Sequence, residues 1–326
     1  MTHDNGFRVY AGDGRTIQER NTRLQPLELS AWADDPVGYL AEAGLRDAVN
    51  VAVSLGQPLL VTGEPGTGKT QLAGSIAHEL GLSAPLTFNT KSTSSARDLF
   101  YRYDALRNFH DAQFRQGETR PEDYVEYEAL GLAILLAMES GLADPFLPSP
   151  LRGQGPLRSL VLIDEVDKAP RDLPNDVLNE IEQMSFTVKE TGQVFTADRR
   201  FKPIVILTSN SEKTLPDAFL RRCVFYHLTF PDRARLLEIV RRRTGPTASF
   251  SPERMEQAVA HFEKIRELGL RKKPSTAELI AWLRILDRLN LDPANPKPGE
   301  RETLAFTYSI LAKSKEDLAL LQERLG

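Results

Sequence analysis

Residues 63–70 read Gly-Glu-Pro-Gly-Thr-Gly-Lys-Thr, and the spacing of the glycines, the lysine and the threonine suits phosphate binding. The glycines allow the backbone to curl so that successive N–H groups point inward at phosphate oxygens. Lys69 would bring a full positive charge to the β- and γ-phosphates of a nucleotide, and the hydroxyl of Thr70 can ligate Mg²⁺. The predicted nucleotide-binding residues are therefore Gly63, Glu64, Pro65, Gly66, Thr67, Gly68, Lys69, Thr70 and the adjoining Gln71.

An apolar run at residues 59–62 precedes this loop, and a helix-forming run at residues 71–80 follows it. We expect a buried strand before the loop and a helix after it, whose N-terminal partial positive charge adds to phosphate binding. A glycine turn in front of an ordinary surface helix is the alternative interpretation. Strand, loop and helix in this order favour the phosphate site over that alternative.

A second apolar run, residues 159–163, ends in the carboxylate pair Asp164 and Glu165. The run does not alternate polar and apolar residues, which predicts a strand buried on both faces of a parallel sheet. Ligands of such sheets bind beyond the carboxyl ends of the strands. We expect Asp164 to hold Mg²⁺ through water and Glu165 to act as the general base that polarises the attacking water. The pair therefore predicts hydrolysis of a nucleoside triphosphate and not binding alone.

Two further groups can complete this chemistry. Asn210 follows the apolar run 203–207, so its amide is expected at the same sheet edge, where it can contact the γ-phosphate and orient water. On its own, Ser-Asn at a strand end is more typical of a turn. Arg221 and Arg222 end a short helical run, where cations also suit the helix dipole. The functional alternative is an arginine finger delivered to the γ-phosphate of a neighbouring subunit.

The composition excludes several classes of protein. The 326 residues, 41% hydrophobic and 26% charged, are typical of a globular protein with one large or two modest domains. A formal net charge of -4 argues against bulk attraction to nucleic acid. The single cysteine, Cys223, excludes an internal disulfide and a cysteine metal cluster. No run approaches the ~18 apolar residues of a membrane span and no export signal is evident, so a cytoplasmic protein is expected.

The elements around these motifs predict a parallel sheet followed by a separate helical part. Residues 1–36 form a polar N-terminal arm with a possible hairpin at residues 7–14, and residues 37–229 form the large domain. Residues 91–157 exceed a normal sheet crossover and predict an inserted functional element. Short strands are expected at 85–89 and 223–228, a hairpin at 186–201, and helices at 37–55, 128–140 and 174–184. Residues 230–326 are predicted to be all helical, with helices at 232–243, 252–268, 275–289, 301–313 and 315–324.

The order of these motifs resembles that of the AAA+ ATPases, over about residues 37–290. Residues 63–70 match the Walker A motif, Leu160–Glu165 the Walker B motif, Asn210 sensor 1, and Leu215–Arg222 the arginine-finger box. Within the superfamily the chain is most similar to the MoxR family, because of the long segment 91–157 and the hairpin 186–201. The resemblance implies an α/β fold in which the AAA+ P-loop NTPase sheet is flanked by helices and followed by an all-helical lid domain.

The resemblance also implies ATP and Mg²⁺ as ligands, a hexameric ring with nucleotide at the subunit interfaces, and von Willebrand A-domain partners. The family pattern Leu-Pro-x-Ala-x-Leu-x-Arg favours Arg222 over Arg221 as the finger. One motif departs from the family. The sensor 2 arginine usually follows a proline, whereas here Arg271 and Lys273 precede Pro274, so either of them has taken this role or sensor 2 is weak.

Three functions are compatible with the sequence. The first is a ring ATPase that remodels or activates a protein client in the manner of a chaperone. The second is an adaptor whose assembly is switched by nucleotide, and the third is a DNA-directed motor of the restriction type, which the net charge disfavours. Phe100, Tyr101 and Tyr103 in the insert either belong to the core or contact substrate in a central pore. The sequence identifies neither the client nor a preference for ATP over GTP.

Overall fold

The computed structural model describes residues 36–114, 120–139, 141–170, 173–211, 215–244 and 251–325. The expected N-terminal arm and its hairpin therefore lie outside the described residues, apart from residue 36. The chain divides into two compact units. The first, here called the α/β unit, contains Ala41–Glu64 and Lys69–Thr229, and the second, the helical unit, consists mainly of residues 230–325.

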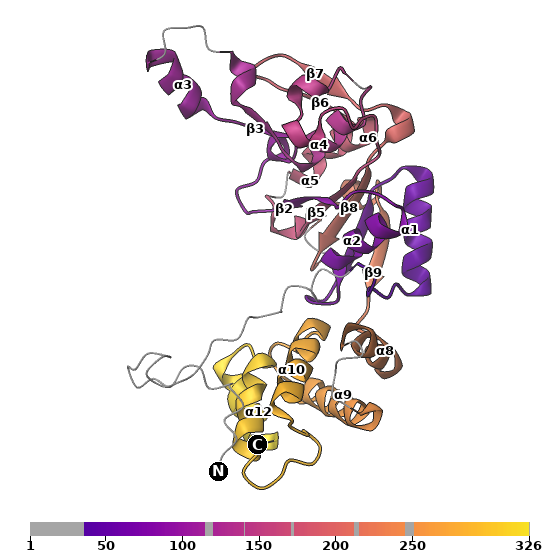
Figure 1. Cartoon of the computed structure of the whole chain (residues 1–326), viewed down its shortest axis with the longest axis vertical. Helices are drawn as coiled ribbons and strands as arrows, with labels where there is room; N and C mark the ends of the chain where they lie inside the picture. Colours follow the sequence, from indigo (N-terminus) through magenta and orange to yellow (C-terminus); the bar gives the residue numbers. More distant parts are fainter. Residues whose placement is uncertain are drawn as a thin grey trace. The chain divides into compact units, whose positions relative to one another are not determined.

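Five parallel strands form the sheet of the α/β unit (Figure 1). Their order is β2-β5-β8-β1-β9, with bounds Leu86–Asn89 (β2), Leu160–Asp164 (β5), Ile204–Ser209 (β8), Leu59–Gly63 (β1) and Val224–Leu228 (β9). Nearly every residue of β1, β5 and β8 is buried, as expected for apolar strands covered on both faces. Because β5, β8 and β1 are neighbours and parallel, the three predicted motifs that follow them meet at one sheet edge.

Helices cover this sheet and complete its core. They are α1 (Ala43–Leu55), α2 (Lys69–Glu79), α4 (Ala129–Leu136), α5 (Leu173–Asp176), α6 (Leu178–Gln183) and α7 (Asp217–Leu220). Helix α4 is apolar all round and buried along most of its length, so it belongs to the core and not to an exposed insert. The single helix expected at 174–184 is wrong, because the chain forms two short helices there and Met184 ends the second with a φ of 49°.

The start of helix α1 also differs from the prediction. Helix α1 begins at Ala43 instead of residue 37, since Glu42 has an extended backbone with ψ 161° and Gly38 disfavours helix. It ends as predicted at Gly56, whose φ of 62° lets its N–H reach the carbonyls of Ala52 and Val53. Figure 1 shows α1 beside the edge strand β9.

The segment before α4 contains elements that the sequence did not predict. Strands β3 (Tyr101–Tyr103) and β4 (Val125–Tyr127) pair antiparallel, and α3 (Ala105–Phe114) lies in the chain between them. In Figure 1, α3 extends away from the sheet of its unit. The expected hairpin at 186–201 is present but shorter, as β6 (Ser185–Thr187) pairs with β7 (Val194–Thr196).

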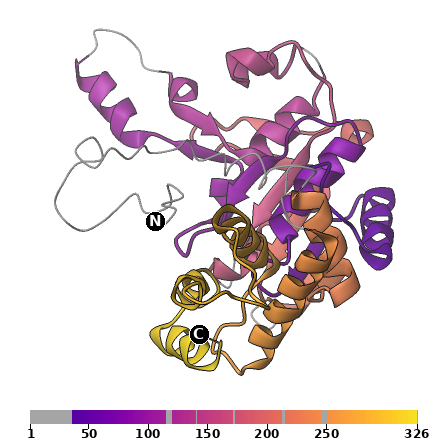
Figure 2. The same cartoon turned by 60° about the horizontal axis from the view of Figure 1, so that its bottom comes forward.

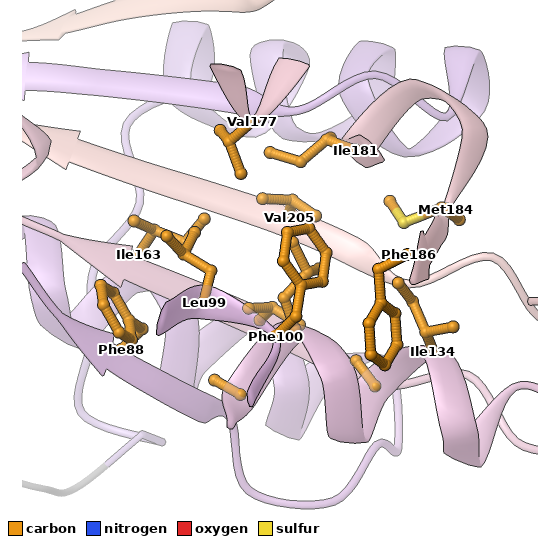
Figure 3. Close-up of a cluster of buried hydrophobic side chains, with 14 of the residues drawn as sticks. Phe88, Leu99, Phe100, Ile134, Ile163, Val177, Ile181, Met184, Phe186 and Val205 are labelled. Atoms are coloured by element: carbon orange, nitrogen blue, oxygen red, sulfur yellow. The ribbon is translucent and has the colours of Figure 1, made fainter. Parts of the chain in front are cut away.

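A cluster of buried hydrophobic side chains, which includes the rings of Phe100 and Phe186, joins this segment to the core (Figure 3). The ring centroids of Phe100 and Phe186 lie 5.1 Å apart, and those of Phe186 and Phe195 lie 5.3 Å apart. Phe100 and Tyr101 expose only 3% and 2% of their surface. The pore-contact alternative is therefore wrong for these two residues, which are ordinary core, while Tyr103 is half-buried.

The helical unit consists of five α-helices and short turns in the part of the chain that the structure describes. They are α8 (Arg233–Thr244), α9 (Pro252–Glu267), α10 (Thr276–Leu289), α11 (Arg301–Thr307) and α12 (Lys315–Leu325), coloured orange to yellow in Figure 2. Ser275 and Glu278 form a capping box that starts α10, and Asn290 ends it with a φ of 52°. The helix expected at 301–313 is shorter than predicted, since α11 passes into a 3₁₀ turn at Tyr308. None of the described helices has the length and apolar character that crossing a membrane requires.

His261 lies in an aromatic stack inside the helical unit. Its ring centroid is 5.8 Å from that of Trp282 and 6.0 Å from that of Tyr308, and its Nε2 lies 3.0 Å from the Tyr308 hydroxyl. Burial, with a smaller contribution from Lys264, lowers the pKa of His261 to about 4. The folded protein therefore keeps this imidazole neutral at pH values where an unfolded histidine is charged.

We expect this histidine to make folding sensitive to acid. Because its pKa is lower in the folded state, the unfolded state binds the proton first, and the free energy of unfolding falls as pH drops from about 6.5 towards 4. Chemical unfolding at pH 7 and pH 5 measures the difference, and His261→Phe should reduce it by about 1–2 kcal/mol. An identical difference in the variant would contradict the assignment.

Candidate functional site

The loop after β1 has the backbone conformation that its glycines predict. Gly63, Gly66 and Gly68 have φ values of 148°, 73° and 95°, which L side chains rarely adopt. A Cβ atom at Gly63 would also lie 2.5 Å from the carbonyl oxygen of Leu228 on β9. Glycine is therefore required where the strand turns into the loop, and α2 then begins at Lys69.

The ammonium group of Lys69 is held inside this loop. Its side chain is almost fully buried, and Nζ donates to the carbonyl oxygens of Gly63 at 2.8 Å and Glu64 at 2.9 Å and to Asn210 Oδ1 at 2.9 Å. Burial lowers the pKa of Lys69, and nearby carboxylates, Asp167 foremost, oppose that shift. The lysine is thus positioned where phosphate oxygens could replace the loop carbonyls as its partners.

Hydroxyl and carboxylate oxygens from α2, β5 and β8 gather beside the lysine. Thr70 Oγ1 lies 3.1 and 3.2 Å from the two carboxylate oxygens of Asp164, and the Thr208 hydroxyl donates to Oδ1 of the same carboxylate. Mg²⁺ prefers such oxygen ligands and is commonly held by one or two protein groups together with substrate phosphates. Thr70 and Asp164 fit this requirement. No cluster of three or more His, Cys, Asp or Glu side chains suited to a metal occurs among the described residues.

Glu165 follows Asp164 at the end of β5 in an unusual backbone conformation. Its φ of 55° and ψ of 49° place it in the left-handed region, which is strained for a residue with a side chain. Its N–H donates to the hydroxyl of Thr208 at 2.9 Å, which fixes the backbone to the neighbouring strand β8. Its carboxylate accepts a hydrogen bond from Nζ of Lys168 and remains 40% exposed. A carboxylate held at the mouth of the site can contact water.

Asn210 lies at the same edge, as predicted, and contacts two of the other site residues. Its side-chain oxygen accepts from Lys69, and its backbone N–H donates to Asp167 Oδ1 at 3.1 Å. The structure therefore brings together Lys69, Thr70, Asp164, Glu165 and Asn210 from the start of α2 and the ends of β5 and β8. Of the remaining predicted loop residues, Glu64, Pro65, Gly66 and Gln71 are exposed and Thr67 and Gly68 are half-buried.

The two arginines lie elsewhere in the α/β unit. Arg221 and Arg222 occupy the turn between α7 and β9 and are both exposed. In the parallel register, Val224 is opposite Leu59 and Leu228 is opposite Gly63. The arginines precede Val224, so they lie at the sheet edge opposite to the phosphate loop, about 13 Å of strand or more away.

The two candidates for sensor 2 belong to the helical unit. The backbone N–H groups of Arg271 and Lys272 donate to the buried carboxylate of Asp317, at 2.9 and 3.3 Å. The Arg271 guanidinium lies 3.4 Å from Glu316 in an exposed ion pair, and Lys273 is exposed. The structure thus anchors the loop that carries both candidates through Asp317, which the sequence did not single out.

Three further residues of the site were missed as contributors. Thr208 links the carboxylate of Asp164 to the backbone of Glu165, and its only sequence signal was its place just before Ser209-Asn210. Asp167 and Lys168 belong to a 3₁₀ turn after β5. Asp167 contacts Asn210, and Lys168 contacts Glu165. Their charges resemble those of any polar turn, so no feature of the sequence could have identified them.

The sequence places this site in a known family. Residues 58–223 match the AAA domain family, dynein-related subfamily, and this match covers about half of the chain. The chain belongs to this AAA family. The matched stretch includes the phosphate loop, the carboxylate pair and the arginines, so the parallel sheet with its loop is the AAA+ P-loop fold, followed here by a helical region. AAA domains in general hydrolyse nucleoside triphosphates.

Similar solved structures include the RuvB Holliday junction branch migration motor of Thermotoga maritima. It is 14% identical, with 86% of this chain and 73% of that chain covered and a TM-score of 0.47. One variant of the same protein is 15% identical, with 86% of this chain and 73% of that chain covered and a TM-score of 0.47. A second variant is 16% identical, with 82% of this chain and 67% of that chain covered and a TM-score of 0.45. No curated protein sequence matches the chain significantly.

Proposed function

We propose that this AAA protein binds and hydrolyses ATP with Mg²⁺ and works as a MoxR-like ring in the cytoplasm that remodels or activates a protein client. One observation carries the hydrolytic part of the proposal. Lys69, the Thr70–Asp164 oxygen pair, the Glu165 carboxylate and the Asn210 amide converge at one sheet edge beside a glycine-rich loop. These are the groups that phosphoryl transfer to water requires.

Each residue has a distinct part in the proposed reaction. The N–H groups of the loop and the Lys69 ammonium bind the phosphates, with Lys69 exchanging the carbonyls of Gly63 and Glu64 for phosphate oxygens. Thr70 and Asp164 hold Mg²⁺, which when bound neutralises charge on the β- and γ-phosphates. The Glu165 carboxylate accepts a proton from the attacking water. Asn210 donates its amide N–H to the γ-phosphate or to that water, while its oxygen stays with Lys69.

We assign Arg222 to the site of a neighbouring copy. Its place at the opposite edge of the sheet keeps its guanidinium away from the phosphate loop of its own subunit. Among the described residues, no side-chain hydrogen bond or ion pair of Arg222 was found, and the side chain is exposed. An arginine that is far from its own loop and open to a partner suits an arginine finger acting between subunits.

Three parts of the proposal do not depend on the geometry of this site. They are the ring, the protein client and the contact between the lid and the nucleotide. A hexamer, a protein client and a von Willebrand A-domain partner rest on the resemblance of the motifs and the hairpin to the MoxR family. Arg271 and Lys273 remain the proposed lid cations for the nucleotide. The acidic net charge of -4 favours a protein client over nucleic acid.

Lys69→Ala tests the nucleotide site. The substitution removes the buried ammonium group of the loop, so we expect the affinity for ATP to fall about 30-fold or more. Isothermal titration of ATP in Mg²⁺ measures this loss. Lys202→Ala is the matched control, since burial also lowers the pKa of Lys202, but its Nζ donates to the Glu182 carbonyl and to none of the site residues. Equal affinities of Lys69→Ala and the wild type would contradict the proposed site.

A further inference from the structure

A lysine contacts the proposed general base in the described structure. Nζ of Lys168 donates to Oε2 of Glu165, and this hydrogen bond raises the pKa of Lys168. The two residues are three apart: Glu165 directly precedes the turn formed by Val166–Lys168, and Lys168 is its last residue. Their side chains are 53% and 40% exposed, so the pair lies at the surface of the site.

The backbone of this turn is fixed on both sides. Val166 is 2% exposed and packs in the core, and the N–H of Lys168 donates to the carbonyl of Glu165 at 2.9 Å. On the side of β8, the Asp167 carboxylate accepts from the N–H of Asn210 at 3.1 Å. The backbone that carries Lys168 is therefore held in place by packing and hydrogen bonds, which keeps its ammonium group within reach of Glu165.

We propose that Lys168 is a positioning residue that holds Glu165 in a resting ion pair and thereby limits the basal rate of ATP hydrolysis. The inference rests on the proposed function, in which Glu165 is the base. The hydrogen bond occupies one of the two carboxylate oxygens, so Glu165 must leave Lys168 or use the other oxygen to reach water.

The exposure of the pair sets the size of this restraint. Surface ion pairs contribute little to stability, because water competes for both partners and long side chains lose conformational freedom. Such a pair can open during each turnover, so Lys168 slows hydrolysis without preventing it. Removing the ammonium should consequently raise the catalytic rate by only about two- to fivefold.

Steady-state phosphate release by Lys168→Met, at saturating Mg²⁺ and a range of ATP concentrations, tests the inference. We expect kcat to rise about two- to fivefold with KM unchanged, and Lys168→Arg, which can restore the pair, to return kcat toward the wild-type value. Lys297→Met is the matched control. It breaks another ion pair between residues three apart, Lys297 with Glu300 at 4.0 Å in the helical unit, and should leave both constants unchanged.

The outcomes separate this inference from the proposed function. If the wild type releases no more phosphate than Glu165→Gln, the proposed function fails and the inference fails with it. If the wild type is active and kcat of Lys168→Met is unchanged, the restraint does not exist. A lower kcat or a higher KM in Lys168→Met would also overturn the inference, because it would make Lys168 a contact of the nucleotide.

Discussion

Glu165→Gln is expected to retain ATP and to reduce its hydrolysis by about 10²–10⁴-fold. The amide keeps the size of the side chain but cannot accept a proton from water. The groups proposed to bind phosphate and metal, Lys69 and the Thr70–Asp164 pair, are unchanged by the substitution. ATP binding should therefore persist, and the protein should accumulate in the ATP-bound form.

Bound nucleotide after rapid desalting and phosphate release under single-turnover conditions measure the two halves of this expectation. Glu256→Gln is a suitable control, because Glu256 is an exposed glutamate paired with Arg241 at 3.3 Å in the helical unit. The control should hydrolyse ATP like the wild type. Hydrolysis at the wild-type rate by Glu165→Gln itself would show that Glu165 is not the base.

Arg222→Ala is expected to lower kcat by about 10³-fold or more while ATP binding remains close to that of the wild type. An arginine finger stabilises charge that develops on the γ-phosphate in the transition state, so its loss affects the rate more than the affinity. The loop proposed to bind ATP lies at the opposite edge of the sheet and keeps all its contacts.

The neighbouring Arg221 provides the control for this prediction. It is equally exposed and in the same turn after α7, so Arg221→Ala removes the same charge at almost the same place. The family pattern aligns the second arginine with the finger, and we expect Arg221→Ala to lose much less activity. Measurements of kcat for both variants, with ATP affinity determined separately, decide between them. Equal losses would assign the effect to net positive charge.

The sequence predicted that the site residues gather at one edge of the sheet, because each strand and each motif could be recognised from its own local sequence. Strands β1, β5 and β8 are short and largely apolar runs, which are typical of strands buried on both faces of a parallel sheet. Each is followed by a motif, and parallel strands bring the ends of neighbours together without any knowledge of tertiary contacts. The glycine loop was predictable for the same reason, as its backbone requires φ values that glycine alone adopts easily.

The parts that were missed depend on contacts between distant residues or on very short elements. The hydrogen bonds from Thr208 to Asp164 and from Asn210 to Asp167 join residues more than 40 positions apart, and composition does not encode such pairs. Strands β3 and β4 have three residues each, too few for a periodic pattern to be recognised. The burial of Phe100 and Tyr101 likewise follows from packing against Phe186, which lies far along the chain.

We propose that one copy of this protein supplies the phosphate loop and the next copy supplies Arg222. A mixing experiment tests this arrangement most directly. Arg222→Ala keeps an intact loop and Lys69→Ala keeps an intact finger, so each should be inactive alone. In mixed assemblies, proven by pull-down of a tagged form, some interfaces join the intact phosphate loop of one variant to the intact arginine finger of the other. We predict that turnover returns to up to about a quarter of the wild-type rate, because neighbouring positions fill at random. No turnover in proven mixed assemblies would contradict the claim.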